Sequence, residues 1–170
     1  MSRLSSFLAR VPLVLIAVAL LLPLPGCSSQ PSREEQNAAY CREIAPILDD
    51  LSEAKDVYVD DLGLVSDLLS AMLIEPAHTM IGIATDDYLL VLDDCDYRTQ
   101  AIEPPSHFTG HHYLTQFIYQ NKLAAGLMYA GIVTSDESGQ SEALALMDEA
   151  SEALDMYAVH CQVELGLEGI

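Results

Sequence analysis

Apolar residues recur at steps of three and four over most of the chain beyond residue 40, and this spacing constrains the fold more than any other feature. Such spacing places side chains on one face of an α-helix. Four stripes follow one another, at residues 41–72, 81–102, 107–132 and 144–165. No segment of useful length shows the strict alternation of a half-buried strand. The sequence therefore predicts an all-α domain.

Breaks between the stripes indicate where the helices end. Ile74-Glu75-Pro76 interrupts the first pattern, because a proline disfavours helical geometry in the residue before it. Pro104-Pro105 stops the second helix, and Ser106 is placed to cap the third. Residues 134–139, TSDESG, have the composition of a turn. Four amphipathic helices with short turns predict an antiparallel up-down-up-down four-helix bundle, with a long first helix, over residues 37–170.

The start of the chain has the pattern of a signal peptide. Arg3 and Arg10 supply positive charge, residues 11–24 are apolar apart from prolines, and small residues lead into Cys27. A membrane-spanning helix needs about 20 apolar residues, and this run is shorter and broken by prolines. We therefore expect residues 1–26 to be removed.

Leu24-Pro25-Gly26-Cys27 resembles the lipobox of bacterial lipoproteins. The resemblance implies that the Cys27 thiol carries a covalent lipid and that a dedicated signal peptidase cuts just before it. In Gram-negative lipoproteins, a residue other than Asp directly after the lipidated cysteine resembles the pattern for sorting to the outer membrane, and here that residue is Ser28. Residues 27–36 then form a lipidated tether. The expected location is extracytoplasmic, anchored to the cell membrane or, in a Gram-negative source, to the outer membrane.

A second resemblance concerns the third and fourth stripes. PPSHFTGHHYLTQFIYQNKLAAGLMYAGI and SEALALMDEASEALDMYAVH loosely resemble helical domains of uncharacterised bacterial lipoproteins. This resemblance covers about a third of the chain, and it identifies no functional residue.

The charge of the chain restricts its partners. The formal net charge is −19, and residues 1–26 hold two arginines and no acidic residue, so −21 is left after their removal. Nucleic acid and anionic lipid surfaces repel such a protein. We expect contact with the membrane through the lipid, contact with envelope proteins, and no nucleic acid.

Pairs of aspartates at positions 49/50, 60/61, 86/87 and 93/94 account for part of this charge. None of them lies in the Asp-x-Asp-x-Asp-Gly pattern of a calcium loop. The pairs at 86/87 and 93/94 lie seven residues apart, on the side of the helix away from its apolar stripe. We interpret them as a solvated acidic face.

Three cysteines remain for the exported domain. If successive helices alternate in direction, Cys95, Cys161 and His111 lie at similar heights near one end of the bundle, and Cys41 belongs to that end too. Thiols oxidise outside the cytoplasm, so we predict one disulfide. Equal height favours Cys95 with Cys161, whereas adjacent helices favour Cys41 with either of them, and the choice stays open.

Candidate sites of chemistry are few. One alternative is a metal or cofactor site formed by His107, His111 and His160 with a cysteine, because imidazole and thiolate bind zinc and copper. His107 and His111 are four residues apart, but no HExxH pattern contains them. A GxSxG motif and a glycine-rich phosphate loop are both missing. The first expectation is a non-enzymatic interaction or ligand-capture module with no catalytic residue, no metal and no cofactor besides the lipid.

Overall fold

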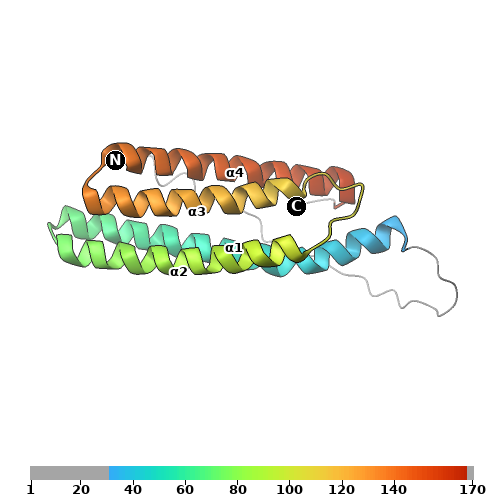
Figure 1. Cartoon of the computed structure of the whole chain (residues 1–170), viewed down its shortest axis with the longest axis horizontal. Coiled ribbons are helices and arrows are strands. Elements are labelled where there is room, and N and C mark those ends of the chain that lie inside the picture. Colours follow the sequence, from blue (N-terminus) through green and yellow to red (C-terminus); the bar gives the residue numbers. More distant parts are fainter. Residues whose placement is uncertain (1–30, 168–170) are drawn as a thin grey trace.

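Four α-helices make up nearly all of residues 31–167, the part of the chain that the computed structural model describes. They are α1 (Arg33–Ser70), α2 (Ile74–Ala101), α3 (His111–Thr134) and α4 (Glu137–Leu165), and no strand occurs in this range. The helices lie side by side and alternate in direction (Figure 1). The all-α bundle prediction is confirmed, and α1 is the longest helix with 38 residues.

The start of α1 differs from the predicted start of the domain at residue 37. Ser32 accepts a hydrogen bond from the backbone N–H of Glu35, and the Glu35 side chain accepts one from the N–H of Ser32. This capping box satisfies two N–H groups of the first helical turn, so the last residues of the predicted tether are helical. Cys27 and residues 1–26 lie outside the described residues. Between residues 31 and 167 no helix combines the length and apolar character that crossing a membrane requires.

The turn between α3 and α4 is short because its residues satisfy both helix ends. Ser135 takes a left-handed conformation, with φ of 57°, and its N–H bonds back to the end of α3. Asp136 then caps α4 by accepting a hydrogen bond of 3.0 Å from the N–H of Ser138. A Cβ on Gly131 would lie only 2.9 Å from the backbone nitrogen of Gln140. Glycine therefore permits the close approach of the two helices at this end.

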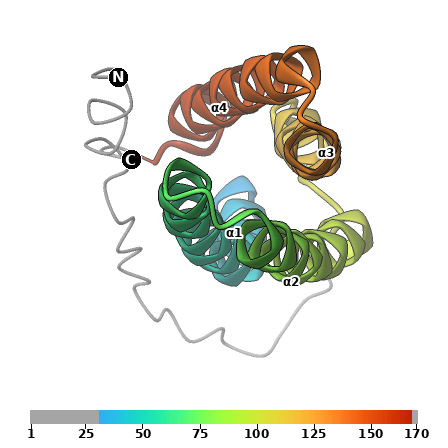
Figure 2. The ribbon, with the colours of Figure 1, turned by 90° about the vertical axis from the view of Figure 1, so that its left-hand side faces the viewer.

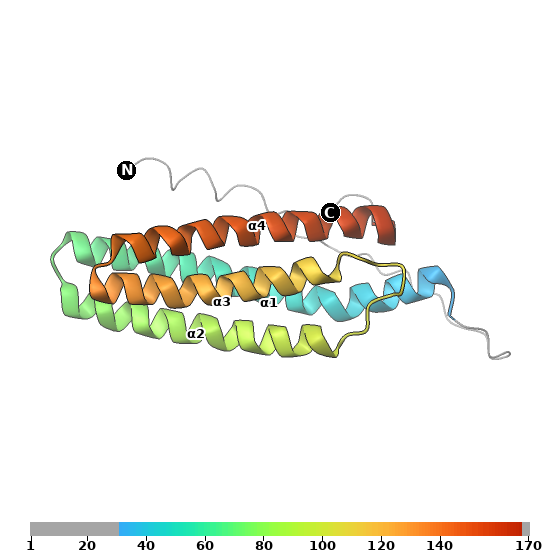
Figure 3. The same cartoon turned by 45° about the horizontal axis from the view of Figure 1, so that its top comes forward.

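The connection between α2 and α3 is a correction to the sequence-based prediction. Ser106 does not cap α3, which begins at His111 with Gly110 at its N-cap position. Phe108 is buried, and its ring centroid lies 5.0 Å from that of Tyr40 in α1. Burial of this aromatic ring outweighs the local capping preference of the serine. Figure 3 shows the connection closing the bundle near the last turns of α4.

The four helices form two hairpins, α1–α2 and α3–α4, which join through close packing of α2 on α3 (Figure 2). The backbones of α1 and α4 stay farther apart, and long side chains bridge them. The hydroxyls of Tyr40 and Tyr157 lie 3.2 Å apart, and Lys55 donates a hydrogen bond of 3.4 Å to Ser151. The first and last helices are thus held by polar contacts.

The inner face of α4 also differs from the prediction. Leu144 was expected on that face and is 50% exposed, whereas Ala143, Ala150 and Ala153 are buried. Among the described helices, α4 has its most extensive backbone contacts with α3. Small side chains allow such contacts, so the buried face is rotated away from the bulkier leucine.

Candidate functional sites

A chain of hydrogen bonds crosses the end of the bundle where the α2–α3 connection closes it. The Tyr40 hydroxyl of α1 lies 2.9 Å from Nδ1 of His111 in α3 and 3.2 Å from the Tyr157 hydroxyl of α4. Cys161 lies one turn beyond Tyr157, and each of these side chains shifts the pKa of the other. Phe108 covers this group, with its ring edge-on to Tyr157 at 5.9 Å. Three helices are therefore linked by side chains that few water molecules reach.

The groups in this chain are held in their neutral forms. Burial lowers the pKa of His111 below 6.5, and it raises the pKa of Tyr40 and of Tyr157. Burial also raises the pKa of the Cys161 thiol to about 12. A neutral imidazole that carries its proton on Nε2 accepts a hydrogen bond from the Tyr40 hydroxyl at Nδ1. Because a reactive cysteine needs a lowered pKa, this arrangement favours structural linkage of the helices over nucleophilic chemistry.

His107 and His160 each have partners of their own. The His107 Nε2 lies 2.8 Å from the Asn37 side-chain oxygen, and the His160 Nδ1 lies 2.9 Å from Glu164. Thr109 donates to Glu164 from its hydroxyl and from its backbone N–H, and these bonds, with His160, lower the pKa of Glu164 to about 2. The carboxylate therefore anchors the α2–α3 connection onto α4.

The metal-site alternative assumed that His107 and His111 share one helix. That assumption is wrong, because α3 begins at His111 and His107 belongs to the connection before it. Across residues 31–167, no three side chains of His, Cys, Asp or Glu are grouped so that they could hold a metal ion. The described residues therefore give no support to a metal site at His107, His111 and His160.

All three cysteines of the described domain are buried and free. Cys41 and Cys161 interact electrostatically, and both act on Tyr40. Cys95 instead contacts the carbonyl of Ile47 at 4.0 Å. Ile47 lies six residues beyond Cys41, or about 9 Å along α1. No disulfide joins these cysteines in the described residues. Among the pairings that the sequence leaves open we predict Cys41 with Cys161, because Cys41 contributes to the raised pKa of Cys161 whereas Cys95 lies beside Ile47.

A second candidate site, which the sequence analysis missed, is an apolar groove between α1 and α2 on the outer surface. Its floor contains Tyr58 and Ala84, and its walls carry Val57 of α1 with Leu90 of α2. These two wall residues are 56% and 71% exposed. An adjoining hollow shares Ala84 and adds Ile83, which is 59% exposed. Together the two hollows form what we call the α1–α2 groove.

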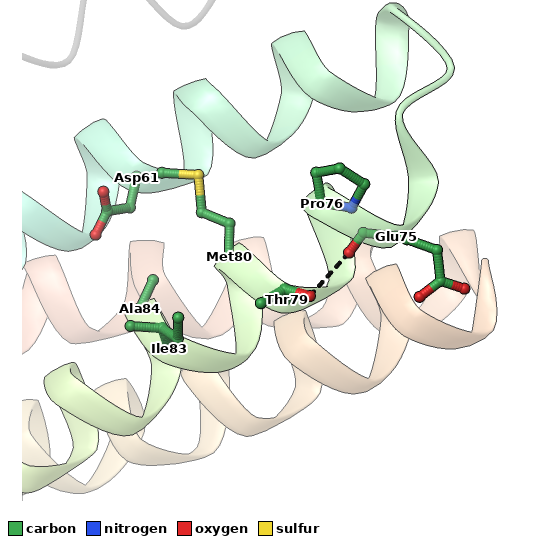
Figure 4. Close-up of a pocket in the computed structure, with 7 residues that line it drawn as sticks. All are labelled: Asp61, Glu75, Pro76, Thr79, Met80, Ile83 and Ala84. Carbon is green, nitrogen blue, oxygen red and sulfur yellow. Dashed lines mark hydrogen bonds between the residues drawn. The ribbon is translucent and has the colours of Figure 1, made fainter.

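Figure 4 shows the end of the α1–α2 groove nearest the turn between the two helices. Met80 of α2 reaches toward Asp61 of α1, and Ile83 and Ala84 follow one turn later on α2. Thr79 bonds back to the Glu75 carbonyl at 3.0 Å, which satisfies its hydroxyl. The hollow thus presents apolar side chains between two carboxylates, Asp61 and Glu75.

Carboxylates surround the α1–α2 groove, and no lysine or arginine lines it. The acidic lining residues are Asp50, Glu53, Asp61, Glu75, Asp87 and Asp94. Arg98 bonds two of them, Asp50 and Asp94, at one end. The other four form no ion pair within residues 31–167. The groove is therefore an apolar strip with a negative margin.

A signal for this groove is present in the sequence. Ile83, Leu90 and Tyr97 are spaced seven residues apart, and all three are strongly exposed. The aspartate pairs at 86/87 and 93/94 lie between them. A second apolar stripe on α2, flanked by acids, indicates a face that meets another surface.

Comparison of the chain with protein-family models, with curated proteins and with solved structures found no match.

Proposed function

We propose that this chain is an extracytoplasmic lipoprotein, anchored to a membrane through Cys27, whose helical bundle binds another envelope protein without catalysing a reaction. The lipobox resemblance supports the anchor. The α1–α2 groove supports the binding role, and it is the observation that carries this proposal. Leu90, Ile83 and Val57 are each more than half exposed there. Apolar side chains gathered on one surface mark sites of protein interaction more often than single exposed ones do.

The position of the anchor fits this role. Ser32, which caps the start of α1, lies five residues after Cys27, so the bundle would stand close to the lipid surface. With a charge of −21 in the processed chain, the bundle would be repelled by anionic lipids, and its faces would stay open to proteins. A partner bound in the α1–α2 groove would be held beside the membrane.

The anchor is tested by metabolic labelling with a fatty acid. Wild-type protein should incorporate the label and sediment with membranes. Cys27→Ser should do neither, while Ser29→Ala, which leaves the cysteine in place, should behave as wild type. Labelling of Cys27→Ser equal to wild type would overturn the anchor.

The binding role is tested by photo-crosslinking in the cells that produce the protein. A crosslinking residue in place of Leu90 should give a discrete adduct with one protein, because this side chain lies on the wall of the groove. The same residue in place of Glu152, exposed on α4, should give none. Identical adducts from both positions, or none from Leu90, would contradict a binding role for the groove.

A further inference from the structure

We propose that the α1–α2 groove binds an amphipathic α-helix of another protein, one whose apolar stripe is flanked by lysine and arginine. This inference rests on the proposed binding role of the groove and adds the chemistry of the partner. The apolar strip between α1 and α2 and the carboxylates along its two margins are the observations behind it.

The length of the groove fits a helix. Its α2 wall runs from Glu75 to Asp94, which is about 28 Å at 1.5 Å per residue. A helix of about twenty residues has the same length. The groove also runs between two antiparallel helices, so a third helix would lie along both of them.

The spacing of the exposed side chains matches a helical partner too. Ile83 and Leu90 of α2 line the groove, are seven residues apart and are both more than half exposed. On α1, Val57 lines the groove, and Leu64, seven residues beyond it and outside the lining, is 52% exposed. Seven residues correspond to two helical turns. Helices that pack lengthwise present apolar residues at this repeat. A partner with the same repeat would place one side chain between each successive pair.

The carboxylates around the groove favour a positively charged partner. Glu53 and Asp87 are exposed carboxylates on opposite walls, Glu53 on α1 and Asp87 on α2. Asp61 and Glu75 continue the acidic margin toward the turn. The nearest cations are already engaged, since Arg98 binds Asp50 and Asp94. Basic residues on both sides of a partner's apolar stripe would pair with these free carboxylates and speed the encounter.

The same charges disfavour other occupants. A second copy of this chain would bring acidic margins against acidic margins, and like charges facing each other oppose association. An anionic membrane surface would be repelled for the same reason. A cationic helix is the occupant that satisfies both the apolar floor and the carboxylate margin.

The experiment uses two synthetic peptides of about three heptads with the same leucine and isoleucine stripe. One carries lysine beside the stripe and the other glutamate. Full-length protein, purified in a non-ionic detergent from whichever cell fraction contains it, is titrated into each fluorescent peptide, and binding is read by anisotropy. We expect the lysine peptide to bind at least about tenfold more tightly than the glutamate peptide, and to weaken as salt rises.

Variants locate the binding. Leu90→Gln removes an exposed apolar side chain and should weaken the lysine peptide about fivefold or more. The double variant Glu53→Gln/Asp87→Asn removes two groove carboxylates, and Asp148→Asn/Glu152→Gln removes two exposed carboxylates from α4. The first pair should weaken binding severalfold, and the second should change it little.

Three results would overturn the inference: equal affinity for the two peptides, equal weakening by the groove and α4 pairs, or no binding of either peptide. Anisotropy reports binding whether or not Cys27 carries a lipid. A crosslink from Leu90 to a partner without a basic helix would retain the proposed function and reject this partner. Fatty-acid labelling tests the anchor, crosslinking from Leu90 tests the binding role, and the peptide titration tests the chemistry of the partner, so these failures are distinguishable.

Discussion

Phe108 should be among the most important side chains for closing the bundle, although it lies in a connection. Its ring is 5% exposed and contacts the rings of Tyr40 and Tyr157 at centroid distances of 5.0 and 5.9 Å. Truncation of a buried phenylalanine to alanine costs about 3 to 5 kcal/mol. A connection relaxes more readily than a helix interior, so we expect Phe108→Ala to lower the free energy of unfolding by about 3 kcal/mol.

The assay is urea unfolding followed by far-ultraviolet circular dichroism. Helix content in the absence of urea should be unchanged. On heating, the same loss of free energy corresponds, for a domain of this size, to a fall in Tm of about 10 °C. Tyr119→Ala is the matched control, because Tyr119 is an aromatic residue of α3 that is 61% exposed. It should cost less than about 1 kcal/mol. Equal losses for the two variants would refute the packing of Phe108 into the bundle end.

Four further predictions follow from buried polar groups and from the candidate sites. Tyr88→Phe should lower the free energy of unfolding by about 1 to 3 kcal/mol, because Tyr88 donates a hydrogen bond of 3.0 Å to buried Asn121. Calorimetry should find a smaller loss when an exposed tyrosine of α3 is changed to phenylalanine, and equal losses would reject this prediction. Burial lowers the pKa of His111 below 6.5, so the unfolded chain binds that proton more readily. As the pH falls from about 8 to about 5, the free energy of unfolding should therefore decrease less for His111→Gln than for wild type. Parallel plots of this free energy against pH would exclude the effect. Nonreducing peptide mapping of protein from the envelope should find Cys41 joined to Cys161, with the third cysteine of the domain free; three free thiols would oppose the oxidation prediction. Elemental analysis of chelator-free protein should find no stoichiometric zinc, copper or iron, and one bound ion per chain would revive the histidine site.

Local sequence rules predicted the number of helices, because each helix has its own apolar stripe, and they placed breaks near Pro104-Pro105 and residues 134–139, where the structure has them. They also placed a break at Ile74-Glu75-Pro76, but α1 ends at Ser70 and these three residues begin α2. They failed at Ser106, where a capping residue precedes the start of α3 by several positions. The failure has a tertiary cause. Phe108 gains more from packing against α1 and α4 than Ser106 gains from capping, and no local pattern reports that contact.

Which face of each helix is buried was harder to predict than where each helix lies in the sequence. Hydrophobicity alone places Leu144 inside α4, but the close approach to α3 requires the smaller Ala143 and Ala150. On α2, Leu90 and Tyr88 are both apolar enough to be buried, and only Tyr88 is. The aspartate pairs at 86/87 and 93/94 were interpreted as a solvated acidic face, because Ile83 and Leu90 lie outside the apolar stripe that was assigned to the core of α2.

Mapping of the bound peptide tests the central claim most directly. Amide chemical shifts of isotopically labelled protein, followed while the lysine-flanked peptide is added, report which helices it touches. We predict shifts along residues 50–64 of α1 and 75–94 of α2, with α3 and α4 nearly unchanged. Shifts spread evenly over the acidic surface, or concentrated on α3 and α4, would contradict the account of the groove.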